Sequence, residues 1–261
     1  MNRFSLEGKV AIVTGSSGLI GKAFCDALKE ARAIVVAADI NANDDIKKDY
    51  YFHYTDITNE DSVKELSDTI INKYGKIDIL VNNAAINDMF EDPKATLELS
   101  KFENYPLELW EKSLKVNLTG TFICSKIIGK QMLQNKKGSI INIASTYGIN
   151  APDQSLYINE AGEQMFFKPP AYSVTKGGVI MLTKFLAAYW GKSGIRVNTL
   201  TPGGVENGQD DFFINKYSNK TPLNRMASVE DYKGAIVFLA SDASSYMTGA
   251  NLIVDGGWTA W

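Results

Sequence analysis

The sequence KVAIVTGSSGLIG, at residues 9–21, decides the fold of this chain. Residues 9–13 form a nearly continuous apolar run rich in β-branched side chains, which is typical of a strand buried on both faces of a parallel sheet. Glycines at positions 15, 18 and 21 follow, and a helix is expected over residues 22–30. In a strand, turn and helix of this kind, glycines let backbone N–H groups approach a pyrophosphate at the helix N-terminus. Because the spacing differs from the G-x-G-x-x-G fingerprint, the turn by itself is weak evidence for a dinucleotide site.

A second expected strand, residues 33–38, leads into Asp39. A carboxylate at this position can accept hydrogen bonds from both hydroxyls of an adenine ribose, and it would repel a 2′-phosphate. Neither the serines of the glycine turn nor Ile40 supplies the cation that NADP would favour. The pattern therefore favours NAD as the cofactor, the alternative being a surface aspartate that ends a strand.

The rest of the chain continues to alternate between helices and strands. A helix with Thr58 as its capping residue runs to Tyr74. Further strands are expected at 77–81, 139–145, 195–200 and 251–255, and further helices at 106–134, around Tyr172 and Lys176, and from the cap Ser228 to 240. This order predicts the α/β class. We expect a single domain over residues 1–261, built as a Rossmann-like doubly wound parallel sheet of about seven strands with helices on both faces.

Composition excludes several classes of partner. The net charge of -3 and the absence of a basic run argue against nucleic acid or an anionic membrane, and favour a small-molecule substrate. The two cysteines, Cys25 and Cys124, are expected to be reduced core thiols. With His53 as the only histidine, no metal site is expected. A polar start and the lack of a long apolar run predict a cytoplasmic protein without a signal peptide or a membrane span.

The stretch AYSVTK, at residues 171–176, carries the strongest chemical signal. Tyr172 and Lys176 are four residues apart in a helical pattern, so an ammonium can sit beside a phenol and favour its ionised form. The spacing is common by chance, and a half-buried tyrosine with a solvated lysine is the alternative. Asn117 lies on the apolar side of its expected helix and needs a partner there. Ser145 follows a buried strand, at the edge of the sheet where ligands bind.

Taken in order, these motifs resemble the short-chain dehydrogenase/reductase family over essentially the whole chain. Each motif by itself is weak evidence for the family, but the whole set in this order is specific for it. The set comprises Thr14-Gly15 with Gly18 and Gly21, Asp39, Asp56, Asn82-Asn83-Ala84-Ala85, Val116-Asn117, Ser145, Tyr172-x-x-x-Lys176, Pro202-Gly203 and Val254-Asp255-Gly256-Gly257.

The resemblance implies an NAD(P)-dependent oxidoreductase with a catalytic set of four residues. Tyr172 would be the general acid/base, and Ser145 would hydrogen-bond the substrate oxygen. Lys176 would hold the nicotinamide ribose and lower the pKa of Tyr172, while Asn117 would anchor a water in a proton relay. Transferred in the same way, the cofactor contacts are Gly15, Ser17 and Ile20 along the pyrophosphate, Asp39 and Ile40 at the adenine ribose, Asp56, Ile57, Asn83 and Ala84 around adenine, Tyr172 and Lys176 at the nicotinamide ribose, and Pro202, Gly203 and Val205 at the nicotinamide.

Departures from the family pattern keep two alternatives open. Leu19 stands where the common short form of the turn has glycine, and the resulting spacing is more usual in the family's nucleotide-sugar-modifying branch. A nucleotide-sugar dehydratase or epimerase that recycles bound NAD is therefore the first alternative. A non-catalytic NAD-binding subunit is the second. Ala85 replaces a usual glycine, and Asn207 replaces a threonine that often holds the carboxamide.

Two segments look like insertions relative to the family, at residues 86–105 and 151–170. Both leave the carboxyl edge of the expected sheet, so both should wall a substrate pocket, unless they are only surface loops or subunit contacts. The first holds Asp88, Phe90, Glu91 and Asp92, and the second mixes aromatic, amide and acidic side chains. This mixture suits a sugar or other polyhydroxylated substrate. The chain also resembles oxidoreductases of bacterial flagellin-modification and nonulosonate-sugar clusters, and the leading prediction is an NAD-dependent dehydrogenase of a secondary alcohol.

The two expected helices at 106–134 and 172–191 carry more apolar surface than one sheet face can cover. A subunit interface is therefore expected. The family resemblance implies a homotetramer or homodimer, with the carboxyl end from Asp255 to Trp261 close to a neighbouring subunit.

Overall fold

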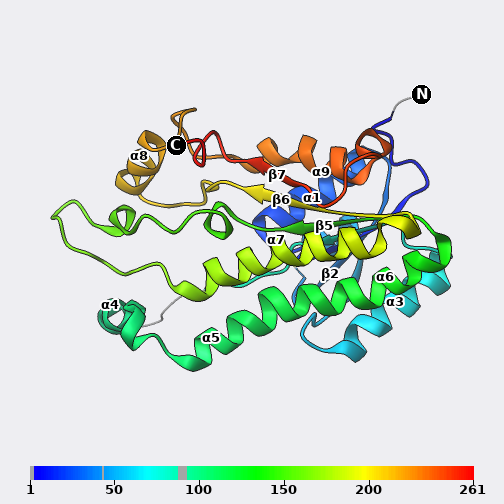
Figure 1. Ribbon diagram of the computed structural model, residues 1–261, viewed down its shortest axis with the longest axis horizontal. Coiled ribbons are helices and arrows are strands. Elements are labelled where there is room, and N and C mark those ends of the chain that lie inside the picture. The colour runs from blue at the N-terminus through cyan, green and yellow to red at the C-terminus, as the bar shows by residue number, and fades with distance from the viewer. Residues whose placement is uncertain (1–2, 43, 88–92) are drawn as a thin grey trace.

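The computed structural model describes residues 3–42, 44–87 and 93–261. Within these residues, seven parallel strands form one sheet in the order β3-β2-β1-β4-β5-β6-β7, and helices cover both of its faces (Figure 1). The strands are β1 Val10–Thr14, β2 Ile34–Asp39, β3 Tyr51–Tyr54, β4 Ile79–Asn82, β5 Gly138–Ile143, β6 Ile195–Pro202 and β7 Asn251–Val254. The expected doubly wound sheet is confirmed, whereas the single-domain organisation stays a prediction.

The helices alternate with these strands along the chain. They are α1 Leu19–Glu30, α2 Asp44–Asp49, α3 Glu60–Tyr74, α4 Pro93–Ser100, α5 Leu107–Ser113, α6 Thr121–Asn135, α7 Pro170–Trp190, α8 Asp211–Asn219 and α9 Lys233–Ala240. A π-helical segment, Leu114–Gly120, joins α5 to α6. Among the described residues, no helix combines the length and the apolar character needed to cross a membrane.

The order of the strands in the sheet determines where a ligand site can form. The chain lays down β1, β2 and β3 in one direction and then returns to place β4 on the other side of β1. The connections therefore diverge beyond the carboxyl ends of β1 and β4, and this divergence opens a crevice in a doubly wound sheet. Gly15 follows β1 and Asn83 follows β4, so both residues lie at this switch point.

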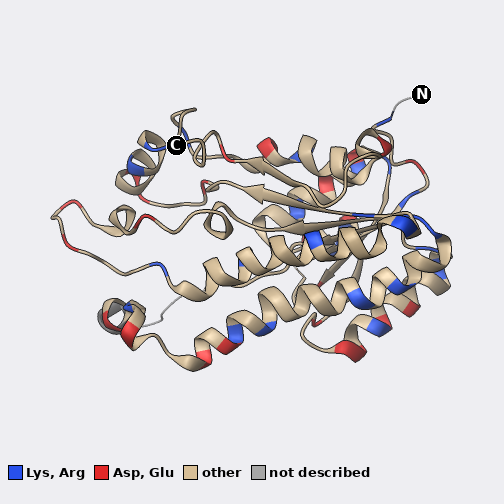
Figure 2. Ribbon diagram, in the orientation of Figure 1, with Lys and Arg blue, Asp and Glu red and all other residues tan. Residues whose placement is uncertain are grey.

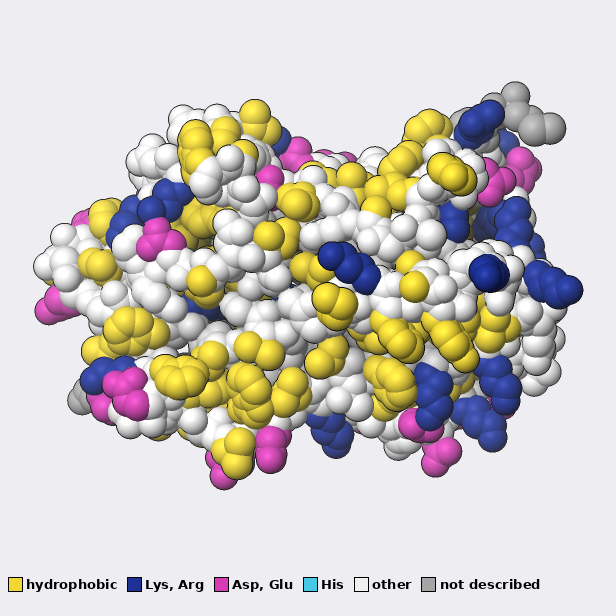
Figure 3. All heavy atoms as spheres, viewed as in Figure 1, with side chains coloured by type: hydrophobic (Ala, Val, Ile, Leu, Met, Phe, Trp, Pro, Cys, Tyr) yellow, Lys and Arg dark blue, Asp and Glu magenta, His cyan; other side chains and the backbone are white. Residues whose placement is uncertain are grey.

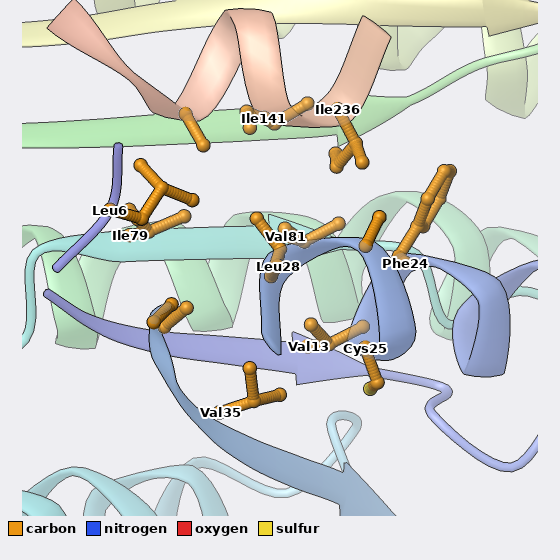
Figure 4. Close-up of a cluster of buried hydrophobic side chains, with 14 of the residues drawn as sticks. Leu6, Val13, Phe24, Cys25, Leu28, Val35, Ile79, Val81, Ile141 and Ile236 are labelled. Carbon is orange, nitrogen blue, oxygen red and sulfur yellow. The ribbon is translucent and has the colours of Figure 1, made fainter. Parts of the chain in front are cut away.

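Successive strand side chains point to opposite faces, and the two resulting cores hold the helices in place. On one face, Val13, Val81 and Ile141 pack against α1 and α9 through Phe24, Leu28 and Ile236, as Figure 4 shows for part of this cluster. On the other face, strand residues including Ile12, Leu80 and Ile140 pack against α3, α6 and α7. Because β1 is buried on both sides, an apolar run without alternation is what this position requires.

Charged side chains lie mainly on the outer faces of helices and in loops, and the strands are largely free of them (Figure 2). One helical face breaks this pattern. Hydrophobic side chains gather along α6 and α7 in Figure 3, where Phe122, Met181, Phe185 and Tyr189 are exposed. Exposed apolar surface of this kind is the feature from which a subunit contact was expected.

Three local expectations differ from the structure. Thr58 is not the cap of α3: the side chain of Asn59 accepts from the backbone N–H groups of Asp61 and Ser62, while Thr58 donates to Asp56. The expected helix at 106–134 is interrupted by the π-helical segment. Strand β3 and helices α2, α4 and α8 were not specified, because they are short and their apolar periodicity is weak.

Candidate active site

A cleft of about 1490 Å³ opens along the carboxyl edge of the sheet. With the exception of Asn117, every expected catalytic and cofactor-binding residue lines it. These residues are Gly15, Ser17, Ile20, Asp39, Ile40, Asp56, Ile57, Asn83, Ala84, Ser145, Tyr172, Lys176, Pro202, Gly203 and Val205. Residues scattered over most of the chain therefore converge in one place, and their binding roles stay predictions.

The glycine turn closes against the loop after β4. Gly15 has a φ of +64°, and a Cβ at this position would lie 2.6 Å from the Cα of Ala84. A Cβ at Gly21 would lie 2.0 Å from the carbonyl oxygen of Gly15. Both positions therefore exclude a larger residue, and the turn brings its backbone close to the cleft.

The N-terminus of α1 is suited to an anion. Gly18 caps this helix without a side chain, and the first turn carries no acidic residue. The backbone N–H groups at the start of α1 therefore receive no side-chain capping oxygen from Gly18, and no carboxylate in the first turn would repel an anion. A helix N-terminus of this kind can bind a pyrophosphate. Leu19 is 46% exposed, so the departure from the common glycine spacing is accommodated in solvent.

Asp39 is held rigidly at the other end of this turn. Its Oδ2 accepts from the backbone N–H of Ser17 at 2.9 Å, and its Oδ1 accepts from the backbone N–H of Asn41 at 3.1 Å. The Ser17 hydroxyl donates to the carbonyl of Asn41 at 2.6 Å. Since each carboxylate oxygen has further acceptor capacity, the geometry fits a ribose diol. These fixed glycines, N–H groups and carboxylate fit the adenosine and pyrophosphate parts of a dinucleotide.

The hydroxyls of Ser145 and Tyr172 lie close together, near enough for Ser145 to lower the pKa of the phenol. Ser145 caps the short 3-10 helix Thr146–Gly148, and its Oγ accepts from the backbone N–H of Tyr147 at 3.2 Å. Burial raises the pKa of Tyr172, and the neighbouring Ser145 hydroxyl opposes this only in part. The tertiary structure therefore brings together the two hydroxyls that the sequence analysis singled out, 27 residues apart in the chain.

Lys176 lies one helical turn after Tyr172 and is buried. Its Nζ donates to the carbonyl of Ile143 at 2.8 Å and lies 5.7 Å from the centroid of the Tyr172 ring. Burial lowers the pKa of Lys176 to about 8. Lys176 was expected to lower the pKa of Tyr172. In the protein by itself, burial has the larger effect and the pKa of Tyr172 is raised.

Asn117 lies just behind the cleft, in the π-helical segment. Its Oδ1 accepts from the backbone N–H of Ile86 at 2.8 Å, and its Nδ2 donates to the carbonyl of Ile86 at 2.9 Å and to the hydroxyl of Thr175 at 3.2 Å. The buried amide therefore finds partners in the loop after β4 and in α7. The short π-helical interruption at this point is of a kind often found at functional sites.

The segment at 151–170 and helix α8 wall the far end of the cleft. Tyr157, Phe166 and Lys168 come from the segment, and Phe213 and Tyr217 come from α8. From the other expected insertion, Ile86 and Asn87 reach the cleft, and Asp88, Phe90, Glu91 and Asp92 lie outside the described residues. Sequence reasoning missed Tyr147 and α8. The signal for α8 was Asp210, whose carboxylate accepts from the backbone N–H of Phe213 at 2.7 Å as a helix cap.

Hydrogen bonds hold both the backbone and the side chain of Lys168 in this wall. The side-chain amide of Gln154 accepts from the Lys168 backbone N–H at 2.8 Å and donates to its carbonyl at 3.3 Å. The Lys168 Nζ donates to Asn87 Oδ1 at 2.5 Å. The inserted segment is also tied to α8, because the Lys216 Nζ donates to the carbonyls of Ser155 and Ile158 and Lys220 forms an ion pair with Asp153.

Comparison with known proteins agrees with this arrangement. A family model described as "Enoyl-(Acyl carrier protein) reductase" matches residues 15–259. D-threitol dehydrogenase of Mycolicibacterium smegmatis is 34% identical over 98% of this chain and 95% of its own length. Post-translational flagellin modification protein A of Campylobacter coli is 33% identical over 97% of this chain and 99% of its own length.

A solved structure leads to the same family. A short chain dehydrogenase from Leptospira borgpetersenii with bound NAD+ superposes with a TM-score of 0.86 at 34% identity, covering 98% of this chain and 94% of that one. Cleft, sheet order and sequence motifs therefore agree. The chain belongs to the short-chain dehydrogenase/reductase family and is an NAD(P)-dependent oxidoreductase.

Proposed function

We propose that the protein is an NAD-dependent dehydrogenase that oxidises a secondary alcohol on a sugar or other polyhydroxylated compound. The observation that carries this proposal is the neighbouring pair of Ser145 and Tyr172 hydroxyls in the same cleft as the Asp39 carboxylate. One end of the cleft offers acceptors for a ribose, and the other offers groups that hold and deprotonate an alcohol.

In this proposal Tyr172 is the general base. The substrate hydroxyl binds between Ser145 and Tyr172, Ser145 holds the reacting oxygen, and the Tyr172 phenolate takes its proton. A bound nicotinamide would supply the acceptor for the hydride of the carbinol carbon. The carbon–hydrogen and oxygen–hydrogen bonds break as the carbonyl forms, so a base within hydrogen-bond reach of the hydroxyl is required.

Lys176 and Asn117 support this chemistry. The Lys176 ammonium, anchored on the carbonyl of Ile143, would hold the nicotinamide ribose and stabilise the phenolate of Tyr172. Asn117 would keep the loop after β4 and α7 in register beside the cleft, and the relay water expected there is part of the proposal.

The preference for NAD rests on the carboxylate of Asp39. Among the described residues at this part of the cleft, the neighbours are Ser17, Ile40 and Asn41, none of which is cationic. A 2′-phosphate would meet a fixed negative charge without a compensating cation. A cytoplasmic location, where NAD is available, belongs to the same proposal.

The substrate class rests on the far wall of the cleft. Asn87, Tyr147, Tyr157, Lys168 and Gln209 give this wall several hydrogen-bonding groups among its aromatic rings. Polar groups in a pocket favour a ligand whose own polar groups pair with them. The similarity to a D-threitol dehydrogenase supports a polyol or sugar in particular.

The experiment is a comparison of cofactors and substrates. Purified protein is incubated with NAD+ or NADP+ and a panel of polyols, sugars, sugar phosphates and nucleotide sugars, and reduced cofactor is followed by absorbance. We expect turnover with NAD+, and a loss of about a thousandfold in kcat/KM in Tyr172→Phe, with Tyr246→Phe at an exposed position as the control.

Other results would contradict the proposal in distinct ways. Product formation without net NADH would favour a dehydratase or epimerase that recycles bound NAD. NAD+ binding without turnover of any panel member would favour a non-catalytic subunit. Full activity of Tyr172→Phe would refute the assigned base.

A further inference from the structure

A pair of phenols lies at the substrate end of the cleft beside the catalytic hydroxyls. The hydroxyl oxygens of Tyr147 and Tyr157 are 3.0 Å apart and hydrogen-bonded, and both residues line the cleft. Tyr172 is close enough to raise the pKa of each phenol electrostatically. The pair is therefore a neighbour of the reacting centre, although the expected catalytic set does not include it.

Each phenol of the pair is held by its surroundings. Tyr147 belongs to the 3-10 helix Thr146–Gly148, and its backbone N–H donates to Ser145. This helix packs directly on α7, because a Cβ at Gly148 would lie 2.7 Å from the carbonyl carbon of Lys176. The ring centroid of Tyr157 lies 4.5 Å from that of Phe166 and 6.0 Å from that of Phe213. The Tyr147 hydroxyl is therefore positioned by the 3-10 helix that holds Ser145 and packs on α7. The Tyr157 hydroxyl is positioned by ring contacts that include Phe213 of α8.

The two phenol hydroxyls have hydrogen-bonding capacity that their mutual bond does not use. Burial raises the pKa of both phenols, for Tyr157 to about 12, so both keep their protons at neutral pH. Two O–H donors are present and their mutual bond uses one. Among the described residues, no acceptor receives the other proton, and lone pairs of both oxygens are also open. Both tyrosines are half-buried and line the cleft, so the spare O–H is available to a ligand that enters it.

We propose that the Tyr147–Tyr157 pair binds a second hydroxyl of the substrate, on the carbon next to the carbinol that is oxidised. A hydroxyl both donates and accepts, so it can accept the spare phenol proton and donate to a phenol lone pair, which a simple alkyl group cannot do. The substrate class is then a vicinal diol or polyol. This inference rests on the proposed function, since it assumes that Ser145 and Tyr172 hold the first hydroxyl.

The test compares isopropanol, propylene glycol and glycerol, which share one three-carbon skeleton and add hydroxyls beside the central carbinol. Wild type, Tyr147→Phe, Tyr157→Phe and the double variant are assayed with NAD+, and Tyr246→Phe is the control. Phenylalanine keeps the ring packing and removes only the hydroxyl, and thermal unfolding checks that the variants fold. We expect wild type to prefer propylene glycol to isopropanol by about tenfold or more in kcat/KM, and the double variant to lose that preference.

A second readout needs no turnover. Binding of propylene glycol to the NAD+-saturated protein, followed by ligand-detected NMR, should weaken by about tenfold in the double variant. An unchanged preference or unchanged binding in the double variant would overturn the role of the pair, even if turnover confirms the dehydrogenase. Absence of turnover on every alcohol would instead overturn the proposed function, and the binding measurement would still decide the role of the pair.

Discussion

The Nζ atom of Lys168 lies 5.0 Å from the centroid of the Tyr172 ring, so the phenol has a cation from the inserted segment as well as Lys176 near it. Lys176 comes from the same helix as Tyr172, whereas Lys168 precedes that helix and is positioned by Gln154 and Asn87. A positive charge near a phenol stabilises the phenolate. We propose that the insertion contributes to the electrostatics of this phenol as well as to the wall of the cleft.

The first prediction concerns pH. Because burial raises the pKa of Tyr172, the phenolate is scarce at neutral pH, and kcat/KM for alcohol oxidation should increase as the pH rises. Lys168→Met removes a nearby positive charge, so the pKa of Tyr172 rises further and the profile moves to higher pH by about one unit. Lys64→Met, on the exposed side of α3, is the control. A profile that stays in place in Lys168→Met would remove Lys168 from this role.

The second prediction concerns the cofactor. Asp39→Ser removes the carboxylate that would repel a 2′-phosphate, and the double variant Asp39→Ser, Ile40→Arg adds a cation beside it. Since Ile40 is 54% exposed, the arginine can be accommodated. We expect kcat/KM with NAD+ to fall by about tenfold or more, and activity with NADP+ to rise. Asp61→Ser at the start of α3 is the control, and an unchanged ratio of NAD+ to NADP+ activity would contradict the role of Asp39.

The third prediction concerns the buried amide of Asn117. Asn117→Ala removes its hydrogen bonds to Ile86 and Thr175 and leaves buried polar groups of the loop after β4 without these partners. We expect a loss of about 2–4 kcal/mol in the free energy of unfolding, together with lower activity. Urea denaturation measures the first and NADH formation the second. Asn135→Ala, at the exposed end of α6, should stay close to wild type, and a variant as stable as wild type would contradict the structural role.

The fourth prediction concerns assembly. We propose that the exposed apolar face of α6 and α7 is a contact between copies of the chain in a homodimer or homotetramer. Met181 and Phe185 are 63% and 62% exposed on this face. Light scattering should show an oligomer for wild type and a smaller species for Met181→Asp, Phe185→Asp, because two carboxylates would be buried without partners. A monomeric wild type at micromolar concentration would refute this proposal.

The framework of the fold could be predicted from local sequence because its strands are buried on both faces. Apolar runs such as residues 9–13 fit only the interior of the sheet. Ser228 caps a helix as expected, but the first turn, Val229–Tyr232, is a 3-10 helix, and α9 begins only at Lys233. Strand β3 was missed because its sequence, Tyr-Phe-His-Tyr, is only half-buried at the sheet edge and carries little pattern. Asn59 rather than Thr58 caps α3, since adjacent capping residues cannot be told apart without their geometry.

For the site, motif order was enough to assemble many, but not all, of the residues that line the cleft, from Gly15 to Val205. Local sequence could not show that Asn117 lies in a π-helical segment, because a polar residue in an apolar helical pattern is compatible with many partners. It also could not pair Tyr147 with Tyr157, whose contact depends on how the inserted segment folds back over the cleft.

By itself, the sequence determined the alternation of elements, the parallel sheet and the set of polar residues at the strand ends, since these depend on hydrophobic pattern and on turn chemistry within a few residues. Only the tertiary structure decided which side chains of the inserted segment face Tyr172, how burial sets the pKa of that phenol and which hydroxyls lie together. Those properties depend on distances between segments that are far apart in the chain, and no local pattern encodes them.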